Sequence, residues 1–230
     1  MARSPDMRIR ILDTALRLLT EGGRDAVSAR AVTAALAIQA PTMYRIFGDM
    51  QGLLDAVAVH GFTTHMATWT GWESGADPVD VIRRGWDAHI DWGVANPHVY
   101  AIAYGEARPG VISPASAAID DILRTLVEQA AAAGLLRLPV DQAVSTLRAI
   151  GAGVVLTLIA TPEIQRDHGL SERSREAALR TILIDPHSSP RVRDSGAAMQ
   201  LKTQLPDTTA LSAHEKALLG DWLDRIAANS

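Results

Sequence analysis

Hydrophobic residues recur every three or four positions along most of this chain, which is the period of an amphipathic α-helix. The first such stretch covers residues 6–21 and is closed by Gly22-Gly23. Its apolar stripe consists of Ile9, Leu12, Ala15, Leu16 and Leu19. Ser28 is a suitable N-cap for a short second helix over about 28–35. After a turn, Pro41 fits the first turn of a third short helix.

The rest of the chain continues the same period. Gly48 ends the third helix, and Asp49 caps a fourth that runs from about 50 to 70. Further helices are predicted over residues 78–95, 97–106, 114–134, 139–161, 171–184 and 212–227. Because no segment alternates apolar and polar residues with a period of two, we predict an all-α protein.

The segment from 185 to 210 interrupts this series, because it holds three prolines and has no clear period. We therefore predict a loop or linker there. The final helix begins at Ser212 and Glu215, which form a capping box. Its predicted apolar face consists of Leu218, Leu219, Trp222 and Ile226. The expected organisation is a head over 1–50, a larger helical body over 51–184, and a linker with a C-terminal helix over 185–230.

Composition narrows the function classes. Hydrophobic residues make up 47% of the 230, so a sizeable core is possible, and there is no cysteine. This excludes disulfides, thiolate zinc sites and cysteine nucleophiles, and it fits a cytoplasmic protein. The N-terminus has no secretory h-region. The longest apolar run, 149–160, is too short to cross a bilayer, so no membrane partner is expected.

Charge is distributed unevenly along the chain. Residues 1–60 hold seven arginines and six acidic residues, whereas the remainder holds 15 basic and 20 acidic residues. The N-terminal segment is therefore weakly basic although the whole chain has a net charge of −4. This asymmetry favours a nucleic-acid contact at the N-terminus.

Residues 9–55 resemble the DNA-binding domain of the TetR family of transcriptional regulators. The resemblance rests on the order and spacing of several short motifs. They are Ile11-Leu12-x-x-Ala15-x-x-Leu18, Gly22-Gly23, Val27-Ser28-x-Arg30-x-Val32, Pro41-Thr42-Met43-Tyr44-Arg45-x-Phe47 and Leu53-Leu54. The resemblance implies a three-helix helix-turn-helix domain, and the helical remainder matches the family's body by layout only.

A short helix in the major groove presents the side chains near its N-terminus to base edges. We therefore expect the third helix to read bases with Gln39, Ala40, Thr42, Met43 and Arg45. The resemblance implies that the Tyr44 hydroxyl binds a phosphate. Ser28 and Arg30, at the start of the second helix, are placed to hold the DNA backbone. The alternative for Tyr44 is that it is a core residue, like Phe47.

Three positions depart from the family's usual pattern. Ala37 stands where glycine usually makes the turn, Gln39 replaces a small hydroxyl cap, and Met50 replaces a lysine. The missing lysine removes one expected phosphate contact, for which Arg8 and Arg10 are candidates to compensate.

An aromatic group in the body is the candidate effector site, because apolar walls with a few polar groups are typical of small-molecule sites. It consists of Trp86, His89, Trp92, Tyr100 and Tyr104. The alternative is that these residues are ordinary core. The family's dimer interface implies a second site, formed by the last two body helices, with Gly151, Val155, Ile159, Ala178 and Ile182 as its candidates. Packing within one chain is the alternative for these residues.

The sequence therefore predicts a cytoplasmic, ligand-responsive transcriptional regulator, most simply a homodimeric repressor. It would bind a palindromic double-stranded DNA operator and be released by a small, partly apolar effector. No cofactor, metal or enzymatic activity is expected, because the seven histidines form no ligand pair and no phosphate-binding loop is evident. The alternative is a helical dimeric adaptor or sensor whose degenerate head does not bind DNA.

Overall fold

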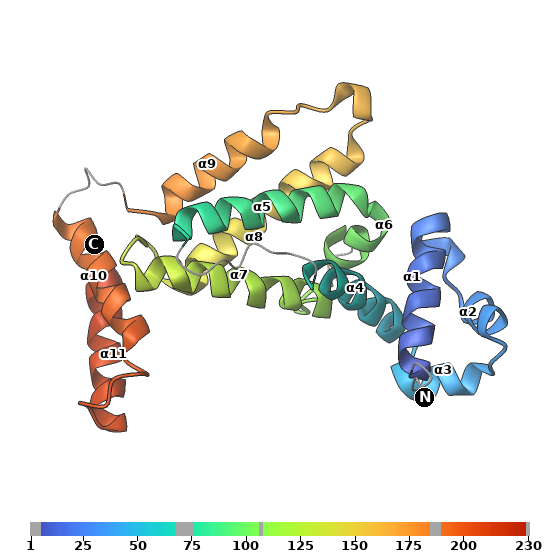
Figure 1. The fold of residues 1–230 in the computed structure, drawn as a ribbon, viewed down its shortest axis with the longest axis horizontal. Helices are drawn as coiled ribbons and strands as arrows, with labels where there is room; N and C mark the ends of the chain where they lie inside the picture. The colour runs from blue at the N-terminus through green and yellow to red at the C-terminus, as the bar shows by residue number, and fades with distance from the viewer. Residues whose placement is uncertain (1–5, 68–75, 106–107, 185–189, 229–230) are drawn as a thin grey trace. The chain divides into compact units, whose positions relative to one another are not determined.

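The computed structural model describes residues 6–67, 76–105, 108–184 and 190–228, and these are almost entirely helical (Figure 1). Within these ranges no strand forms, and the only β-type pairings are two isolated bridges, between Arg108 and Val111 and between Leu136 and Leu183. The predicted all-α class is confirmed. The ends of the predicted helices at 68–70 and at 106, and part of the predicted linker at 185–189, lie outside the described residues.

The chain divides into two compact units, and two of its helices contribute to both. The first unit comprises residues 1–70 and 91–119, and the second comprises 71–90 and 120–230. Four helices open the first unit: α1 (Met7–Ala26), α2 (Ala29–Leu36), α3 (Ala40–Phe47) and α4 (Met50–Met66). The end of α5 (Pro78–Ala95), α6 (Pro97–Tyr100), a π-helix (Ala101–Gly105) and the start of α7 (Pro114–Ala132) complete it.

Caps and breaks in the first unit follow the sequence closely. The carboxylate of Asp6 accepts from the Arg8 backbone N–H at the start of α1 (3.2 Å), and that of Asp49 accepts from Gly52 N–H at the start of α4 (2.7 Å). Gly23 has a φ of 70°, so the helical backbone breaks there as predicted, and another turn then extends α1 to Ala26.

The apolar stripe of α1 differs from the prediction. Ile9 is exposed instead of buried, and Ile11 takes its place in the core. The core stripe of α1 is therefore Ile11, Leu12, Ala15 and Leu19.

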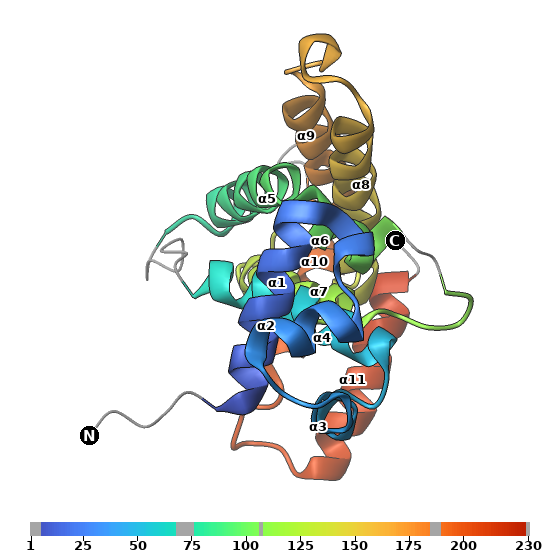
Figure 2. The same ribbon diagram turned by 90° about the vertical axis from the view of Figure 1, so that its right-hand side faces the viewer.

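Helix α1 is the centre of the first unit, since it contacts α2, α4 and α6 (Figures 1 and 2). Gly61 of α4 allows these helices to approach, because a Cβ there would lie 3.2 Å from Leu16 of α1 and 3.4 Å from Val99 of α6. Two polar side-chain contacts also involve α4. His60 meets Asp13 of α1 at 2.7 Å, and Arg108 binds Asp55 through both carboxylate oxygens at 3.1 Å.

The second unit contains the rest of α5 and α7 with α8 (Val140–Ala160), a 3₁₀ turn (Glu163–Gln165), α9 (Leu170–Ile182), α10 (Pro190–Gln204) and α11 (Ala213–Ala228). Helices α8 and α9 lie side by side (Figures 1 and 2). Among the described helices, only α8 is long and apolar enough to cross a membrane by length and composition, a test that core helices of soluble proteins also pass.

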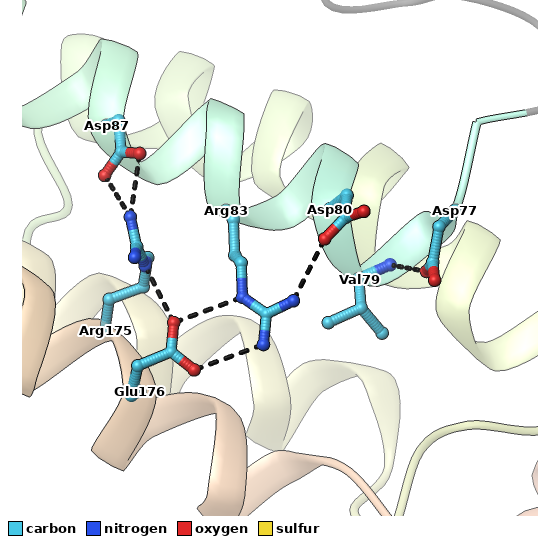
Figure 3. A network of polar contacts seen from close by, with 7 residues as sticks. All are labelled: Asp77, Val79, Asp80, Arg83, Asp87, Arg175 and Glu176. Carbon is cyan, nitrogen blue, oxygen red and sulfur yellow. Dashed lines mark hydrogen bonds and ion pairs between the residues drawn. The ribbon is translucent and has the colours of Figure 1, made fainter.

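A polar network joins α5 to α9 (Figure 3). Arg83 of α5 donates to both carboxylate oxygens of Glu176 (3.1 and 3.2 Å) and to Asp80 (3.0 Å). Arg175 donates to Asp87 of α5 at 2.6 and 2.7 Å. The bond from Arg83 is the main cause that lowers the pKa of Glu176, and Arg175 lowers it further. The network therefore holds the carboxylate in its charged form at neutral pH.

The loop predicted between 185 and 210 was wrong for most of its length, because residues 190–204 form helix α10. This helix packs along α11 in a pair with its own core of Ala198, Leu205 and Leu223. Pro190 is the first residue of the helix, a position where its missing N–H removes no hydrogen bond. Proline there marked the start of a helix rather than a loop.

The apolar face predicted for α11 is also wrong in part. Leu219 packs against the core of the α10–α11 pair as expected, but the buried residue beside it is Leu223. Leu218, Trp222 and Ile226 are each 42–50% exposed. The helix docks on α10 through the Leu219–Leu223 side, which leaves Leu218, Trp222 and Ile226 more exposed.

Candidate nucleic-acid interface

The start of α2 presents two accessible polar side chains. Ser28 caps the helix, with its hydroxyl accepting from the Ala31 N–H at 3.1 Å. Both Ser28 and Arg30 are exposed, and no ion pair within the described part of the chain involves Arg30. A hydroxyl and a guanidinium at an exposed helix N-terminus form a suitable group for binding a phosphate.

The turn between α2 and α3 is built on a left-handed alanine. Ala37 has φ 53° and ψ 41°, and it is the single non-glycine residue with positive φ among those described. Its N–H donates to Ala34 O (3.3 Å), while Ile38 N–H donates to Thr33 O (3.1 Å). These two bonds define a Schellman motif, in which the left-handed position is usually glycine. The turn therefore forms without its usual residue, at the cost of backbone strain.

Helix α3 turns one polar side outward. Gln39 is its N-cap but makes no side-chain capping bond, so its amide is available to other partners. Gln39, Tyr44 and Arg45 are exposed, and Ala40 and Thr42 are partly exposed. No ion pair in the described ranges involves Arg45. Most of the predicted contact residues therefore lie on the accessible side of a short helix.

Met43 is the exception, and the prediction that it contacts base edges is wrong. Its side chain is fully buried. On a helix that packs against α2 and α4, it belongs to the core of the head. Tyr44, by contrast, is 40% exposed, which disagrees with the core alternative for this residue. Phe47 is half-buried, with the guanidinium of Arg8 stacked over its ring at 4.8 Å.

Three of the predicted effector residues come together in the first unit. The ring centroids of Trp92 and Tyr100 are 6.2 Å apart, and those of Tyr100 and Tyr104 are 4.9 Å apart. Tyr100 is fully buried, and this burial, with the nearby Tyr104, raises the pKa of its hydroxyl. The sequence analysis missed Phe62 and His65 of α4, which lie 5.3 and 6.0 Å from the Trp92 ring. Their spacing of three residues on one helix was the available signal.

The other two predicted effector residues belong to the second unit. Trp86 donates its indole N–H to the Ser171 hydroxyl at 3.0 Å. Its ring and the imidazole of His89 lie over Gly151 of α8, where a Cβ would be 3.5 Å from Trp86 and 3.8 Å from His89. Burial lowers the pKa of His89 from 6.5 to about 4, so the imidazole is neutral at physiological pH.

Most of the predicted dimer residues face the interior of the protomer. Gly151, Val155, Ala178 and Ile182 are buried within the single chain, whereas Ile159 is partly exposed. The small residue at 151 is explained by the indole ring that packs on it. An interface on α8 and α9 would therefore use their outward residues, and it remains a prediction.

The head is thus a three-helix domain in which a short, exposed polar helix follows a capped helix and a tight turn. This arrangement defines a helix-turn-helix domain of DNA-binding transcription regulators.

Comparisons with known proteins agree with this class. Residues 11–57 match the family of bacterial regulatory proteins called the tetR family. A TetR transcriptional regulator from Agrobacterium tumefaciens has 20% identity and a TM-score of 0.54, over 78% of this chain and 96% of that chain. A TetR regulator from Streptomyces coelicolor has 20% identity and a TM-score of 0.57, over 84% and 94% of the two chains. A tetR-family protein from Rhodococcus RHA1 has 19% identity and a TM-score of 0.53, over 79% and 100%.

No curated protein matches the chain. Residues 11–57 match the tetR family, and the chain shares the fold of the TetR-family regulators it resembles.

Proposed function

We propose that the protein is a homodimeric, ligand-responsive regulator that binds a palindromic DNA operator, most simply as a repressor. The observation that carries the proposal is the exposed Gln39, Tyr44 and Arg45, with the partly exposed Thr42, on a helix whose inner side is anchored by the buried Met43. Anchoring fixes the rotation of the helix, so the polar side chains project together towards one groove.

Each outward side chain has a chemical match in DNA. Arg45 can donate two hydrogen bonds to O6 and N7 of guanine, and Gln39 can pair with adenine. The Tyr44 hydroxyl, Ser28 and Arg30 suit phosphate oxygens, which fix the register of the head without reading sequence.

Two heads are needed because a single short helix buries too little surface for tight binding. Helix α8 supports a dimer, because only 33% of its most apolar 18-residue stretch is buried inside the protomer. Its outward residues include Gly153, where an added Cβ would meet no atom within 4 Å. Gly153→Arg is therefore compatible with the protomer but not with close packing of a second α8. We expect sedimentation equilibrium to give a dimer for the parent and a monomer for this variant. A variant that stays dimeric would exclude this face of α8.

The effector response is proposed to pass through α4. This helix bears Phe62 and His65 of the aromatic group at one end and contacts α3 at the other. A ligand that binds better when the heads are wrongly spaced would release DNA in proportion to that difference in affinity.

Selection of genomic DNA fragments by the purified protein tests the proposal. We expect enrichment of a near-palindromic sequence whose half-sites lie about one helical turn apart. The Tyr44→Ala/Arg45→Ala variant, which changes only exposed side chains, is the matched control and should enrich nothing. Absence of enrichment by a folded, dimeric parent would instead favour the adaptor that does not bind DNA.

A further inference from the structure

Arg8 joins the first turn of α1 to the last turn of α3. Its guanidinium carbon lies 4.8 Å from the centroid of the Phe47 ring, within the range of a cation–π contact. The Arg8 side chain is exposed, and Phe47 is half-buried beneath it. The ring therefore holds a solvent-accessible cation at the end of the helix that carries Tyr44 and Arg45.

The charge of Arg8 is available to a further anion. The nearby Asp6 carboxylate accepts from the backbone N–H of Arg8, at 3.2 Å. No ion pair of the Arg8 side chain occurs within the described residues. Arg17 differs from Arg8 because it forms an ion pair with Glu21 at 3.0 Å. Nine residues separate the two arginines, which places them on opposite sides of α1.

Beyond Arg45 in the last turn of α3, the junction of α3 and α4 has no cation of its own. From Ile46 to Val59 the chain has no lysine or arginine, and its two acidic residues are occupied locally. Asp49 caps α4 by accepting from Gly52 N–H, and Asp55 is bound by Arg108. Arg8 therefore brings a positive charge from another helix to this part of the head.

The row of exposed groups on α3 also leads to this position. Phe47 follows Tyr44 by three residues, so the two rings are neighbours on the helix surface. A guanidinium stacked on an aromatic face keeps the N–H groups at its edge free to bind two phosphate oxygens. The stacking also restricts the side chain before binding, which lowers the entropy cost of the contact.

We propose that Arg8 is a DNA-backbone contact, held at the α3–α4 junction by Phe47. This inference rests on the proposed function, because it assumes that the α3 side of the head faces DNA. Arg8 strengthens binding to every sequence alike and carries no base specificity.

Salt titration tests the proposal in the full-length protein. Affinity is measured by fluorescence anisotropy between 50 and 200 mM salt, for a fluorescein-labelled random-sequence duplex and for a duplex selected from genomic fragments. We expect Arg8→Ala to weaken binding to both duplexes by a similar factor. The slope of log affinity against log salt should fall by about 0.9 for each bound head. Arg8→Lys should keep most of the slope, and the matched control Arg17→Ala should match the parent.

Two further results separate a phosphate contact from a merely structural role. Phe47→Leu keeps the cation but removes the stacking, so it should weaken binding while the salt slope stays near that of the parent. Thermal unfolding of Arg8→Ala, followed by circular dichroism, should coincide with that of the parent. An unchanged slope in Arg8→Ala, with affinity lost only for the selected duplex, would overturn the inference alone. Absence of salt-dependent binding by the parent would overturn the proposed function and this inference together.

Discussion

The left-handed alanine at the helix-turn-helix turn offers a test of the backbone argument. Ala37 has φ 53° at the C′ position of a Schellman motif that ends α2. The same motif ends α7, where Gly134 N–H donates to Ala131 O (2.9 Å) and Leu135 N–H to Ala130 O (3.0 Å). There the left-handed residue is glycine, with φ 72°. One fold thus contains the motif with its favoured residue and with a strained one.

The substitution Ala37→Gly should stabilise the head. A non-glycine residue in the left-handed region costs about 1–2 kcal/mol. Glycine offsets part of this gain, because it loses about 0.5–1 kcal/mol more conformational entropy on folding. The net expectation is a free energy of local opening that rises by about 0.5–1 kcal/mol.

Native-state hydrogen exchange of the full-length protein measures this local quantity. Protection of amides in peptides covering α2 and α3 should rise by about two- to fivefold in Ala37→Gly. The matched control is Ala34→Gly, the same change at an exposed position inside α2, where glycine costs about 1 kcal/mol. The two variants should therefore shift protection in opposite directions. Equal or lower protection in Ala37→Gly would refute the strain argument.

Three further predictions concern the second unit. Because burial keeps His89 neutral while the unfolded residue titrates near pH 6.5, its contribution is complete above pH 6.5 and declines on acidification towards about pH 4. We expect His89 to account for about 1.5 kcal/mol of the stability lost between pH 6.5 and 5, measured by urea unfolding, and His89→Gln to lose clearly less than the parent; equal losses would contradict this. The pKa of Glu176 is lowered, so its contribution is present above the ordinary value of 4.5 and disappears as the pH falls through the lowered pKa. Glu176→Gln should therefore cost up to about 1 kcal/mol at pH 7 and nothing at pH 2, by the same assay, and a cost that persists at pH 2 would argue against the ion pair. Gly196→Ala should detach α10, because its Cβ would lie 3.1 Å from Gly134 O and 3.2 Å from Leu136 O and would clash with Ile184, whereas Gly220→Ala meets nothing within 4 Å. Hydrogen exchange in α10 should increase for the first variant only, and unchanged exchange would contradict the packing argument.

Local signals in the sequence sufficed for most of the helices and for several of their caps. Ser28, Asp49 and the Ser212–Glu215 pair each cap the helix that their positions predict. These features depend on residues within one turn of each other, so a sequence pattern contains them. Helix α10 was missed because proline was interpreted as a loop signal, although Pro190 opens the helix.

Burial could be predicted less well, because it depends on where distant helices pack. Ile9 and Ile11 are equally apolar, and only contact with α4 and α6 could decide which side of α1 is covered. Met43 was expected at DNA because the sequence pattern alone could not show which side of α3 packs against α2 and α4. Phe62 and His65 are also far from Trp92 and Tyr100 in the chain. Periodicity alone could therefore not assemble that aromatic group.

The measurement that tests the central claim most directly is the affinity ratio between a selected palindromic duplex and a random-sequence duplex. The parent should bind the palindrome at least about 1,000-fold more tightly at physiological salt. If Arg45 reads guanine, Arg45→Ala should reduce this ratio by about 10- to 100-fold for each head, a loss of about 1–3 kcal/mol. Its binding to the random duplex and its thermal unfolding should change little. A ratio in Arg45→Ala equal to that of the parent would contradict the assignment of α3 as the helix that reads DNA.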